Sequence, residues 1–593
     1  MNWSEELLSS FLWIIQSLAI TSIAFSIILA ILVKTTRWAR QFWLITQTYL
    51  SPKQHLKPLC YFWVIIFFNL LAVRLDILFS NWYNAMYSAL QEMNANVFWQ
   101  QMIIFSLLAT VHVLNVLFTY YLSQRFKIQW RTWLNQQYLN QWTANQAYYK
   151  TLHGANQLDN PDQRIQQDID SYVTSSLGFA TGVISSTVSL VAFTAILWDL
   201  SGPMVIAGYE IPHMMVFLVF VYVLITSLIA FKIGRPLIKL NFANEKLNAN
   251  YRYSLIRLKE YAESIAFYRG EKMESHILFK QFNNIISNIW QLVYRMLKLS
   301  GFNLAVSQVS VIFPFIIQAT RYFSGQIKLG DLMQTSQAFG KVQEALSFYR
   351  NSYDDFTAYR AVLDRLTGFH SALHSINHTA NVEIENSDGE VIFQHLTIKR
   401  PDNQSLIEKL NLTLPLGSRL LIQGPSGAGK TTLLRTIAGL WPYSEGKIYC
   451  PQTQALFLSQ KPYLPQGRLI DALYYPALAP QEPDLSHIQE IMQQVNLGHL
   501  SDKLEQQKDW TRVLSLGEQQ RLAFARLFLH KPQVAFLDEA TASMDEGLEE
   551  AMYQLLDSIL PNTTIISVGH RSTLLKHHAL HLQIQSDKSW RLC

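Results

Sequence analysis

The chain has 593 residues, of which 49% are hydrophobic, 13% aromatic and only 15% charged. Soluble globular proteins carry about a quarter charged residues, so this composition indicates contact with lipid. The three cysteines lie far apart, which excludes a disulfide framework or a cysteine-based metal site, and the net charge of +5 is too small to indicate nucleic-acid binding.

Six segments without Asp, Glu, Lys or Arg are predicted to cross a membrane as helices, which takes about 20 mainly apolar residues. The second is expected to continue past Arg74 and Asp76 to Phe79. The first is too long for a signal-peptide apolar region and lacks a basic start, so no cleavable signal is predicted. The six segments are Ser10–Val33, Leu59–Val73, Gln101–Ser123, Val173–Trp198, Ile211–Phe231 and Phe302–Thr320.

Basic residues next to these segments predict the orientation of the chain, because Lys and Arg collect on the cytoplasmic side. Residues 80–100 and 200–210 contain none, so these loops are expected outside, with the N-terminus. The stretches 124–172 and 232–301 show helical periodicity and mixed charge, and they are expected to continue the spanning helices into the cytosol. The basic residues that follow the first, third and fifth spans include Lys34, Arg37, Arg40, Arg125, Lys127, Arg131, Lys232, Arg235 and Lys239.

A seventh crossing is needed if the C-terminal domain lies in the cytosol, because six spans would leave it outside. Leu329–Tyr353 is the segment available, although it contains Lys341 and Glu344 and hydropathy alone would reject it. A polar spanning helix must face protein or a water-filled cavity. This segment is therefore a first indication of an aqueous pathway.

Polar side chains inside the predicted spans have two explanations: they line a wet cavity, or they form hydrogen bonds between helices. For any single residue the second explanation is favoured, whereas the set as a whole favours a wet cavity. Arg74 and Asp76 could form a gate or extend toward the interface, and extension is the favoured interpretation. The candidate lining residues are His112, Asn115, Asn303, Gln308, Gln334, Gln337 and Gln343.

A glycine-rich loop follows a predicted buried strand at Ser418–Gln423, and a helix is expected from Leu433. This strand–loop–helix order is the context of a P-loop, in which glycines let backbone N–H groups converge on phosphates. Lys430 is expected to reach the β- and γ-phosphates, and the Thr431 hydroxyl to ligate Mg²⁺. The alternative, a chance glycine-rich turn, does not account for the flanking elements. The predicted nucleotide-binding residues are Gly424, Ser426, Gly427, Ala428, Gly429, Lys430, Thr431 and Thr432.

The apolar run Val534–Asp538 is predicted to be a buried strand that ends in two carboxylates. Asp538 is expected beside Thr431, where it completes the metal site, and Glu539 is expected to polarise the attacking water. A solvated strand end would explain this motif if it stood alone. Together with the P-loop, and in this order, it indicates nucleotide hydrolysis.

The segment Leu514–Arg521 reads LSLGEQQR, and here the sequence resembles the ABC transporter ATPase family, whose signature is LSGGQ. Leu516 replaces the first glycine and Glu518 the glutamine, whereas Ser515 and Gly517 remain. The resemblance implies that Ser515, Gly517 and Glu518 contact the ATP held by the opposite subunit.

Further landmarks of the family are present. Gln460 matches the loop glutamine that senses Mg²⁺ and couples to the membrane part, so the metal ligands implied are Thr431, Gln460 and Asp538. Ala542–Asp545 matches the loop that communicates across the dimer. His570, which taken alone would more often be structural, matches the switch histidine; it and Glu539 are the implied catalytic residues. The family's adenine-stacking aromatic residue is replaced by Arg400–Pro401, whose arginine plane could stack on the base.

Other segments resemble the branch that holds peroxisomal-type half-transporters and their bacterial relatives. The string NPDQRI is also similar to the BacA/SbmA peptide uptake proteins, which lack an ATPase. For Asn160–Asp168 and Tyr261–Gly270, helix packing and coupling to the ATPase are equally favoured. The segments are Trp130–Leu134, Asn160–Asp168, Tyr261–Gly270, Gly439–Pro442, Gln460–Tyr463 and Tyr474–Pro476.

The resemblance implies an α-helical membrane domain of the exporter-type ABC fold, with six core spans and one extra N-terminal span, fused to an α/β P-loop ATPase domain. The expected parts are residues 1–45, the extra helix; 46–360, the six-span domain; 361–381, a linker; and 382–593, the nucleotide-binding domain.

The resulting hypothesis is an ATP-driven homodimeric half-transporter in a bacterial inner membrane, with a cytoplasmic ATPase. ATP and Mg²⁺ are the expected cofactors. A second copy, the lipid bilayer and a hydrophilic solute such as cobalamin or an antimicrobial peptide, moved inward, are the expected partners, with no nucleic acid. The alternatives are a transporter of acyl-CoA or lipid-like amphiphiles, an ATP-gated regulator that transports nothing, and a weak or inactive ATPase.

Overall fold

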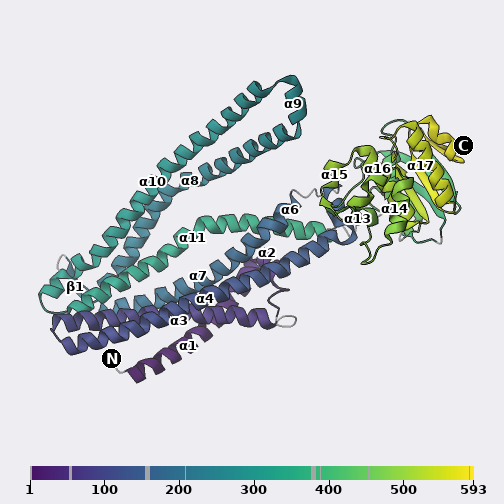
Figure 1. Ribbon diagram of the computed structural model, residues 1–593. Coiled ribbons are helices and arrows are strands. Elements are labelled where there is room, and N and C mark those ends of the chain that lie inside the picture. The colour runs from purple at the N-terminus through teal and green to yellow at the C-terminus, as the bar shows by residue number, and fades with distance from the viewer. Residues whose placement is uncertain are drawn as a thin grey trace. The chain divides into compact units, whose positions relative to one another are not determined.

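The computed structural model describes residues 3–51, 56–153, 160–206, 209–375, 382–387, 389–451, 454–585 and 588–593. It divides into two compact units (Figure 1). One unit comprises Met1–Leu139 with Asn160–His370, and the other comprises Asn140–Asp159 with Ser371–Cys593. The second unit therefore takes in a short segment from the membrane half, which includes α5 (Ala147–His153), as well as the C-terminal domain.

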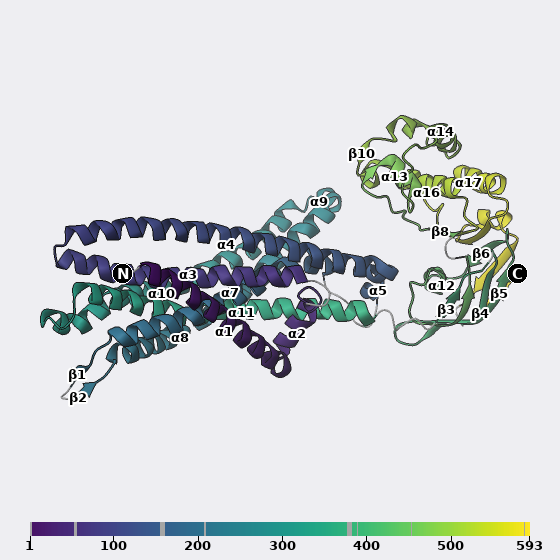
Figure 2. The same ribbon diagram turned by 90° about the horizontal axis from the view of Figure 1, so that it is seen from below.

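The first unit is built of long helices. Within it, α3, α4, α7 and α11 run alongside one another, and α8 and α10 form a long pair that α9 closes at its tip (Figures 1 and 2). Beside the short hairpin of β1 (Met204–Ile206) and β2 (Tyr209–Ile211), its helices are α1 (Trp3–Thr35), α2 (Arg37–Thr46), α3 (Leu56–Gln91), α4 (Ala95–Thr143), α6 (Pro161–Gln163), α7 (Ile169–Leu200), α8 (Met214–Glu260), α9 (Ala262–Tyr268), α10 (Glu271–Phe323) and α11 (Leu329–Ser375).

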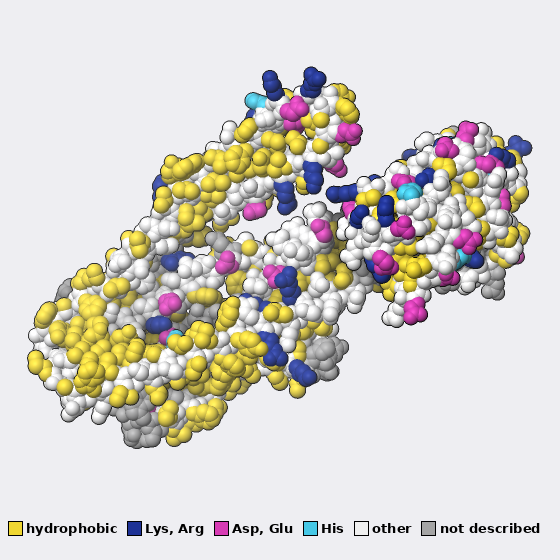
Figure 3. Space-filling view, in the orientation of Figure 1, with side chains coloured by type: hydrophobic (Ala, Val, Ile, Leu, Met, Phe, Trp, Pro, Cys, Tyr) yellow, Lys and Arg dark blue, Asp and Glu magenta, His cyan; other side chains and the backbone are white. Residues whose placement is uncertain are grey.

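Six of the described helices, α1, α3, α4, α7, α8 and α10, are long and apolar enough to cross a membrane. The six apolar spans lie in these helices except for residues 211–213, and α4, α8 and α10 continue beyond the spans, α4 to Thr143, α8 to Glu260 and α10 back to Glu271. α11 has the predicted helical structure but not the apolar composition. Figure 3 shows apolar side chains over the helical unit, as expected for lipid contact.

Two boundaries differ from the sequence prediction. Ile211 lies in the β1–β2 hairpin, and α8 begins only at Met214, after His213 takes a left-handed φ of 53°. Residues 361–375, expected in the linker, continue α11 as a helix. The reason is that Leu363, Leu366 and Phe369 recur at helical spacing and are fully buried, which stabilises a helix that a linker would not need.

The polar face of α11 lies against α3. Gln334 donates a hydrogen bond to Asn81 at 3.0 Å, and Asn84 donates to Gln334 at 2.8 Å and to Asp331 at 2.9 Å. Asn115 of α4 likewise donates to the Phe68 carbonyl of α3, at 3.2 Å. These contacts confirm interhelical hydrogen bonding as the role of Gln334 and Asn115.

Arg74 is paired in the structure, and its extension toward the interface stays a prediction. Its guanidinium is buried and lies 3.0 Å from the Glu6 carboxylate, and it also donates to the Ser9 and Ser10 hydroxyls. The first turns of α1 supply these partners, and a charge in a membrane domain is stabilised when it is paired rather than left in lipid.

The segment Asn160–Asp168 forms α6 and one π-helical turn ahead of α7. Asp168 is 2% exposed and accepts two hydrogen bonds from Arg365 of α11, at 2.7 and 2.6 Å. This geometry supports the packing interpretation of the segment, because it fixes the start of α7 to α11.

The second unit contains a six-stranded sheet in the order β14-β13-β6-β12-β11-β8 and a four-stranded sheet in the order β3-β7-β4-β5. In the larger sheet, β13, β6, β12, β11 and β8 are parallel to one another, whereas β14 is antiparallel to β13. The strands of the two sheets are β3 (Val382–Glu385), β4 (Val391–Lys399), β5 (Ser405–Leu414), β6 (Arg419–Gln423), β7 (Ser444–Tyr449), β8 (Ala455–Leu458), β11 (Val534–Asp538), β12 (Thr564–Val568), β13 (Leu580–Ile584) and β14 (Trp590–Leu592).

Both faces of the larger sheet are buried. Successive side chains of a strand point to opposite faces, and apolar side chains occupy both of them. Leu420 and Phe536 pack toward the smaller sheet, whereas Leu421, Ala535 and Leu537 pack toward the helices. A small pair, β9 (Gly467–Arg468) and β10 (Gln507–Lys508), lies outside these sheets. The helices of the domain are α12 (Lys430–Ile437), α13 (Leu469–Tyr474), α14 (Leu485–Gln494), α15 (Trp510–Val513), α16 (Leu516–His530) and α17 (Glu546–Ile559).

Candidate functional site

Four adjacent parallel strands, β6, β12, β11 and β8, end at the same edge of the larger sheet. β6 leads into the glycine-rich loop, β12 ends two residues before His570, β11 ends at Asp538, and β8 ends two residues before Gln460. The parallel arrangement of these strands thus brings residues that are more than 100 positions apart in the chain to the same edge of the sheet. Ligands of open parallel sheets bind at such carboxyl edges.

The loop between β6 and α12 has the backbone of a phosphate cradle. Gly424, Gly427 and Gly429 have φ values of 153°, 80° and 97°, which L side chains rarely adopt, and a Cβ on Gly424 would lie 2.4 Å from the Ile584 carbonyl oxygen. α12 begins at Lys430, three residues before the predicted start. Ser426, Ala428 and Thr432 lie in this loop and first turn, as the motif requires.

Lys430 is buried, and its ammonium donates to the carbonyls of Gly424 and Pro425, each at 2.9 Å. The Thr431 hydroxyl donates to an Asp538 carboxylate oxygen at 3.3 Å. The structure therefore brings together the lysine, the hydroxyl and the carboxylate that were predicted to bind nucleotide and metal.

Glu539 lies at the centre of the predicted catalytic residues. The Gln460 amide donates to one of its carboxylate oxygens at 2.9 Å, and Nε2 of His570 lies 3.5 Å from the other. Glu539 takes a left-handed φ of 50° while its N–H still bonds the Val568 carbonyl. Such sparsely populated backbone conformations cluster at active sites, and here the strain accompanies the contact with both partners.

The charges of the site shift each other's ionisation. Burial lowers the pKa of Lys430, while Glu539 and Asp538 act to raise it. Burial raises the pKa of Asp538; the Thr431 hydrogen bond opposes this rise and the Glu539 charge adds to it. Both shifts make the charged forms less favourable than in water, and a bound phosphate beside Lys430 and a bound cation beside Asp538 would oppose these shifts.

The signature residues form a separate group at the start of α16. Ser515 is the N-cap, and Glu518 accepts from its N–H at 2.9 Å and its hydroxyl at 2.8 Å, which makes a capping box. Burial alone would raise the pKa of Glu518, but these bonds and His499 lower it overall. A Cβ on Gly517 would lie 3.0 Å from the Ser543 carbonyl oxygen, so this position favours glycine. Among the described residues, none of the hydrogen bonds of this group reaches the P-loop.

Two connecting residues escaped the sequence analysis. Gln520, which is fully buried, donates to the Gln460 carbonyl at 2.8 Å and accepts from the Ser543 N–H at 3.0 Å. Arg571 donates to the carbonyls of Ala542 and Met544, at 3.1 and 3.0 Å. Gln520 lies within the signature segment and Arg571 follows His570, but their bonds span loops that only the folded sheet brings together.

Arg400, the residue expected near the adenine, is exposed in the turn between β4 and β5, where its N–H donates to the Gln404 carbonyl at 2.7 Å. The Trp441 indole donates to the neighbouring Lys399 carbonyl at 2.9 Å. The role of Arg400 in base stacking stays a prediction.

Known proteins similar to this chain agree with the geometry. The family model "ABC transporter transmembrane region 2" matches residues 45–323, and the model "ABC transporter" matches residues 407–542. An uncharacterized ABC transporter ATP-binding protein of Haemophilus influenzae is 58% identical and aligned over 100% of both chains. The inner membrane ABC transporter ATP-binding protein YddA of Escherichia coli is 33% identical, over 86% of this chain and 91% of its own length.

The chloroplastic ABC transporter D family member 2 of Arabidopsis thaliana is 30% identical, over 80% of this chain and 76% of its own. In fold, the chain resembles a bacterial Atm1-family ABC exporter solved with ATP bound, with a TM-score of 0.66 at 16% identity over 88% of this chain and 93% of that chain. The predicted exporter-type fold with a fused ATPase is thereby confirmed. Its ATP-binding domain hydrolyses ATP to drive transport. The chain belongs to the ABC transporter family, and it is a multi-pass half-transporter related to the D-family transporters.

Proposed function

We propose that two copies of this chain form an ATP-driven transporter that moves hydrophilic solutes, such as cobalamin or antimicrobial peptides, into the cell across a bacterial inner membrane. The inner-membrane relative YddA supports the location. We infer a hydrophilic substrate from charged side chains on helices that are predicted to cross the membrane. Lys341 of α11 lies 2.7 Å from Asp76 of α3, both half-buried, and the neighbouring Glu344 side chain is 77% exposed.

An exposed carboxylate on a spanning helix is unfavourable in lipid, so we infer that Glu344 faces a water-filled cavity. Figure 3 shows acidic, basic and histidine side chains within a hollow of the otherwise apolar helical unit. His112, Asn303 and Gln337 each have a buried polar atom without a hydrogen-bond partner among the described residues. Water or a polar solute would satisfy such atoms, and this set supports a wet route.

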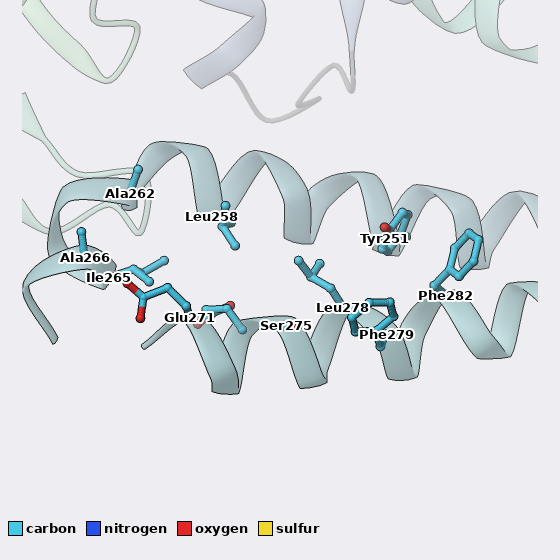
Figure 4. A pocket seen from close by; sticks show the side chains of 11 residues that line it. Tyr251, Leu258, Ala262, Ile265, Ala266, Glu271, Ser275, Leu278, Phe279 and Phe282 are labelled. Carbon is cyan, nitrogen blue, oxygen red and sulfur yellow. The ribbon is translucent and has the colours of Figure 1, made fainter. Parts of the chain in front are cut away.

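The second copy is needed because one chain carries one P-loop group and one signature group. We assign the ATP between Lys430 and Asp538 of one copy and Ser515 and Gly517 of the other. The tip formed by α8, α9 and α10 supports contact with another copy: Phe267 and Tyr268 are 79% and 87% exposed. Leu258, Ile265 and Phe279 surround an apolar pocket of about 540 Å³ beside them (Figure 4).

In the proposed reaction, Lys430 and the loop N–H groups hold the phosphates at the start of α12. Among the described residues no three His, Cys, Asp or Glu side chains cluster as a metal site. Oxygen donors suit Mg²⁺, which keeps phosphate and water ligands, and Thr431, Asp538 and Gln460 fit that role. Glu539 orients and deprotonates the attacking water, and His570 contacts the γ-phosphate. Closure and reopening of the ATPase pair then change the access of the membrane cavity.

The alternative is transport of acyl-CoA or lipid-like amphiphiles, which the similarity to D-family transporters favours. The charged Asp76–Lys341–Glu344 group distinguishes the two hypotheses, since a carboxylate-rich lining repels the phosphates of an acyl-CoA.

The experiment is uptake of labelled cobalamin and of a labelled cationic peptide antibiotic into cells that lack other routes. Wild-type protein is compared with Glu539→Gln, with acyl-CoA-stimulated ATPase activity measured in parallel. Uptake that disappears in the variant supports the proposal. Uptake that is unchanged contradicts ATP-driven transport, and acyl-CoA stimulation without uptake of either solute supports the alternative.

A further inference from the structure

The N-terminal helix α1 leaves an apolar groove in the membrane half of the molecule. The groove has a volume of about 520 Å³ and is lined by α1, the short helix α2, α7 and α11. Its lining residues recur every three or four positions along both α1 and α7, so one face of each helix is turned toward it. α1 also packs on α3, where Phe25, which is one of the lining residues, contacts Phe62 and Trp63.

The groove extends over the whole hydrocarbon core, so the acyl chains of a lipid from one leaflet would occupy about half of its length. Along α1 it extends from Trp13 to Leu32, which at 1.5 Å per residue is about 28 Å, close to the thickness of the hydrocarbon core.

One end of the groove is built like a membrane interface. Trp38 and Phe42 of α2 line this end, and the Trp38 ring lies 5.1 Å from that of Phe356 of α11. α2 is a short helix that combines arginines with large aromatic residues, the composition of helices that lie at the lipid headgroups. Ser176 and Tyr359, hydrogen-bonded to each other at 2.7 Å, add polar groups at the same end.

This end also carries positive charge. Lys34, Arg37 and Arg40 are exposed within seven positions. Arg37 pairs with Asp364 at 3.2 Å, whereas neither Lys34 nor Arg40 forms an ion pair among the described residues. Two uncompensated cations at a headgroup level attract anionic lipid.

We propose that the groove binds an anionic phospholipid of the cytoplasmic leaflet, with an acyl chain between α1 and α7 and its phosphate near Lys34 and Arg40. The lipid then fills the part of the groove nearest α2 and holds the N-terminal helix on the bundle. The proposal does not depend on which solute is moved.

The test measures phospholipid that co-purifies with the full chain in detergent, by mass spectrometry, per protein chain. Ala180→Trp places a large side chain in the groove and is expected to remove the retained lipid. Val113→Trp, on an exposed site of α4 outside the groove, is the matched control and should retain it. Basal ATPase activity and elution volume report that each variant is folded; if Ala180→Trp is misfolded, Val183→Trp replaces it.

The headgroup is tested with the pair Lys34→Gln and Arg40→Gln, against Lys57→Gln on α3 as control. The ratio of anionic to zwitterionic lipid retained is expected to fall about tenfold or more in the pair and to stay unchanged in the control. Equal lipid in Ala180→Trp and Val113→Trp would overturn the site. A ratio that ignores the charge pair would overturn the anionic assignment, and so would retention of acyl-CoA in place of phospholipid. A disulfide between copies through Val183→Cys would show an interface instead.

Discussion

Glu539 shows how a single side chain depends on several strands. Its carboxylate contacts Gln460, which follows β8, and His570, which follows β12, while Asp538 at the end of β11 contacts Thr431. A general base of this kind contributes about 10²–10⁴ to a rate. We expect Glu539→Gln to lower the ATPase rate by about that factor while ATP binding persists.

The measurement is phosphate release alongside binding of a fluorescent ATP analogue. Glu546→Gln, the same exchange at an exposed position in the first turn of α17, should leave both unchanged. A Glu539→Gln protein that hydrolyses ATP at the normal rate would remove Glu539 from the proposed mechanism.

His578 predicts a pH dependence of stability. The ring is buried; its Nδ1–H donates to the Leu574 carbonyl at 2.8 Å, and its Nε2 lies 2.8 Å from the Ser567 hydroxyl. Burial lowers its pKa from 6.5 to about 4. The unfolded chain therefore binds a proton that the folded chain does not, and stability is lost as the pH falls from 6.5 to about 4, by about 3 kcal/mol in total.

Scanning calorimetry of the detergent-solubilised chain between pH 7.5 and 5 measures this loss. His578→Gln should flatten the pH dependence of the transition temperature of the C-terminal domain. His487→Gln, at an exposed position of α14, is the control and should keep the wild-type slope. An unchanged slope in His578→Gln would contradict the assignment.

At the scale of elements, the start of α7 is held to α11 by one buried carboxylate. Asp168 is 2% exposed and its partner Arg365 is 41% exposed. Removing the partner of a buried charge costs about 3–5 kcal/mol. Partial solvation of Arg365 reduces this cost, and so does Arg164, which lies 3.8 Å from the same carboxylate. We expect Arg365→Ala to lower the free energy of unfolding of the helical unit by about 2–3 kcal/mol.

The neighbouring residue supplies a matched control. Asp364 pairs with Arg37, and both side chains are exposed, at 51% and 78%. Asp364→Asn should change the free energy of unfolding by less than about 1 kcal/mol. Denaturant unfolding in detergent compares the two variants, and equal losses would show that burial of Asp168 does not set the strength of the pair.

At the scale of the whole molecule, the proposed dimer places each ATP between two copies. A dimer of one copy with Lys430→Ala and another with Ser515→Arg has both defects in the same composite site and keeps the other site intact. A dimer of one copy with both changes and one wild-type copy has a defect in each site. We expect ATP binding at about one site per dimer in the first arrangement and at no complete site in the second.

Differently tagged copies, purified in tandem, allow trapped nucleotide to be counted per dimer. Trapping at no site in the first arrangement and at one site in the second would mean that each ATP is bound within one copy, and equal trapping would mean that the signature group does not contribute to the site. Because both dimers carry the same pair of substitutions, a difference in trapping cannot come from general destabilisation.

The sequence by itself determined what depends on local order along the chain. The run at Ser418–Gln423 gives β6, the glycines that follow give left-handed backbone, and six charge-free segments give long apolar helices. Binary pattern and glycine placement act over a few residues, so they are readable without a fold.

Only the tertiary structure decided which side chains meet. Gln520 forms hydrogen bonds with Gln460 and Ser543, and Arg74 of α3 pairs with Glu6 of α1. Residues 361–375 extend α11 because Leu363 and Leu366 are buried. Strand order and helix packing set these contacts over tens to hundreds of positions. Whether a side chain is buried or paired depends on the neighbouring helix or strand that packs against it, and no local pattern in the chain specifies that neighbour.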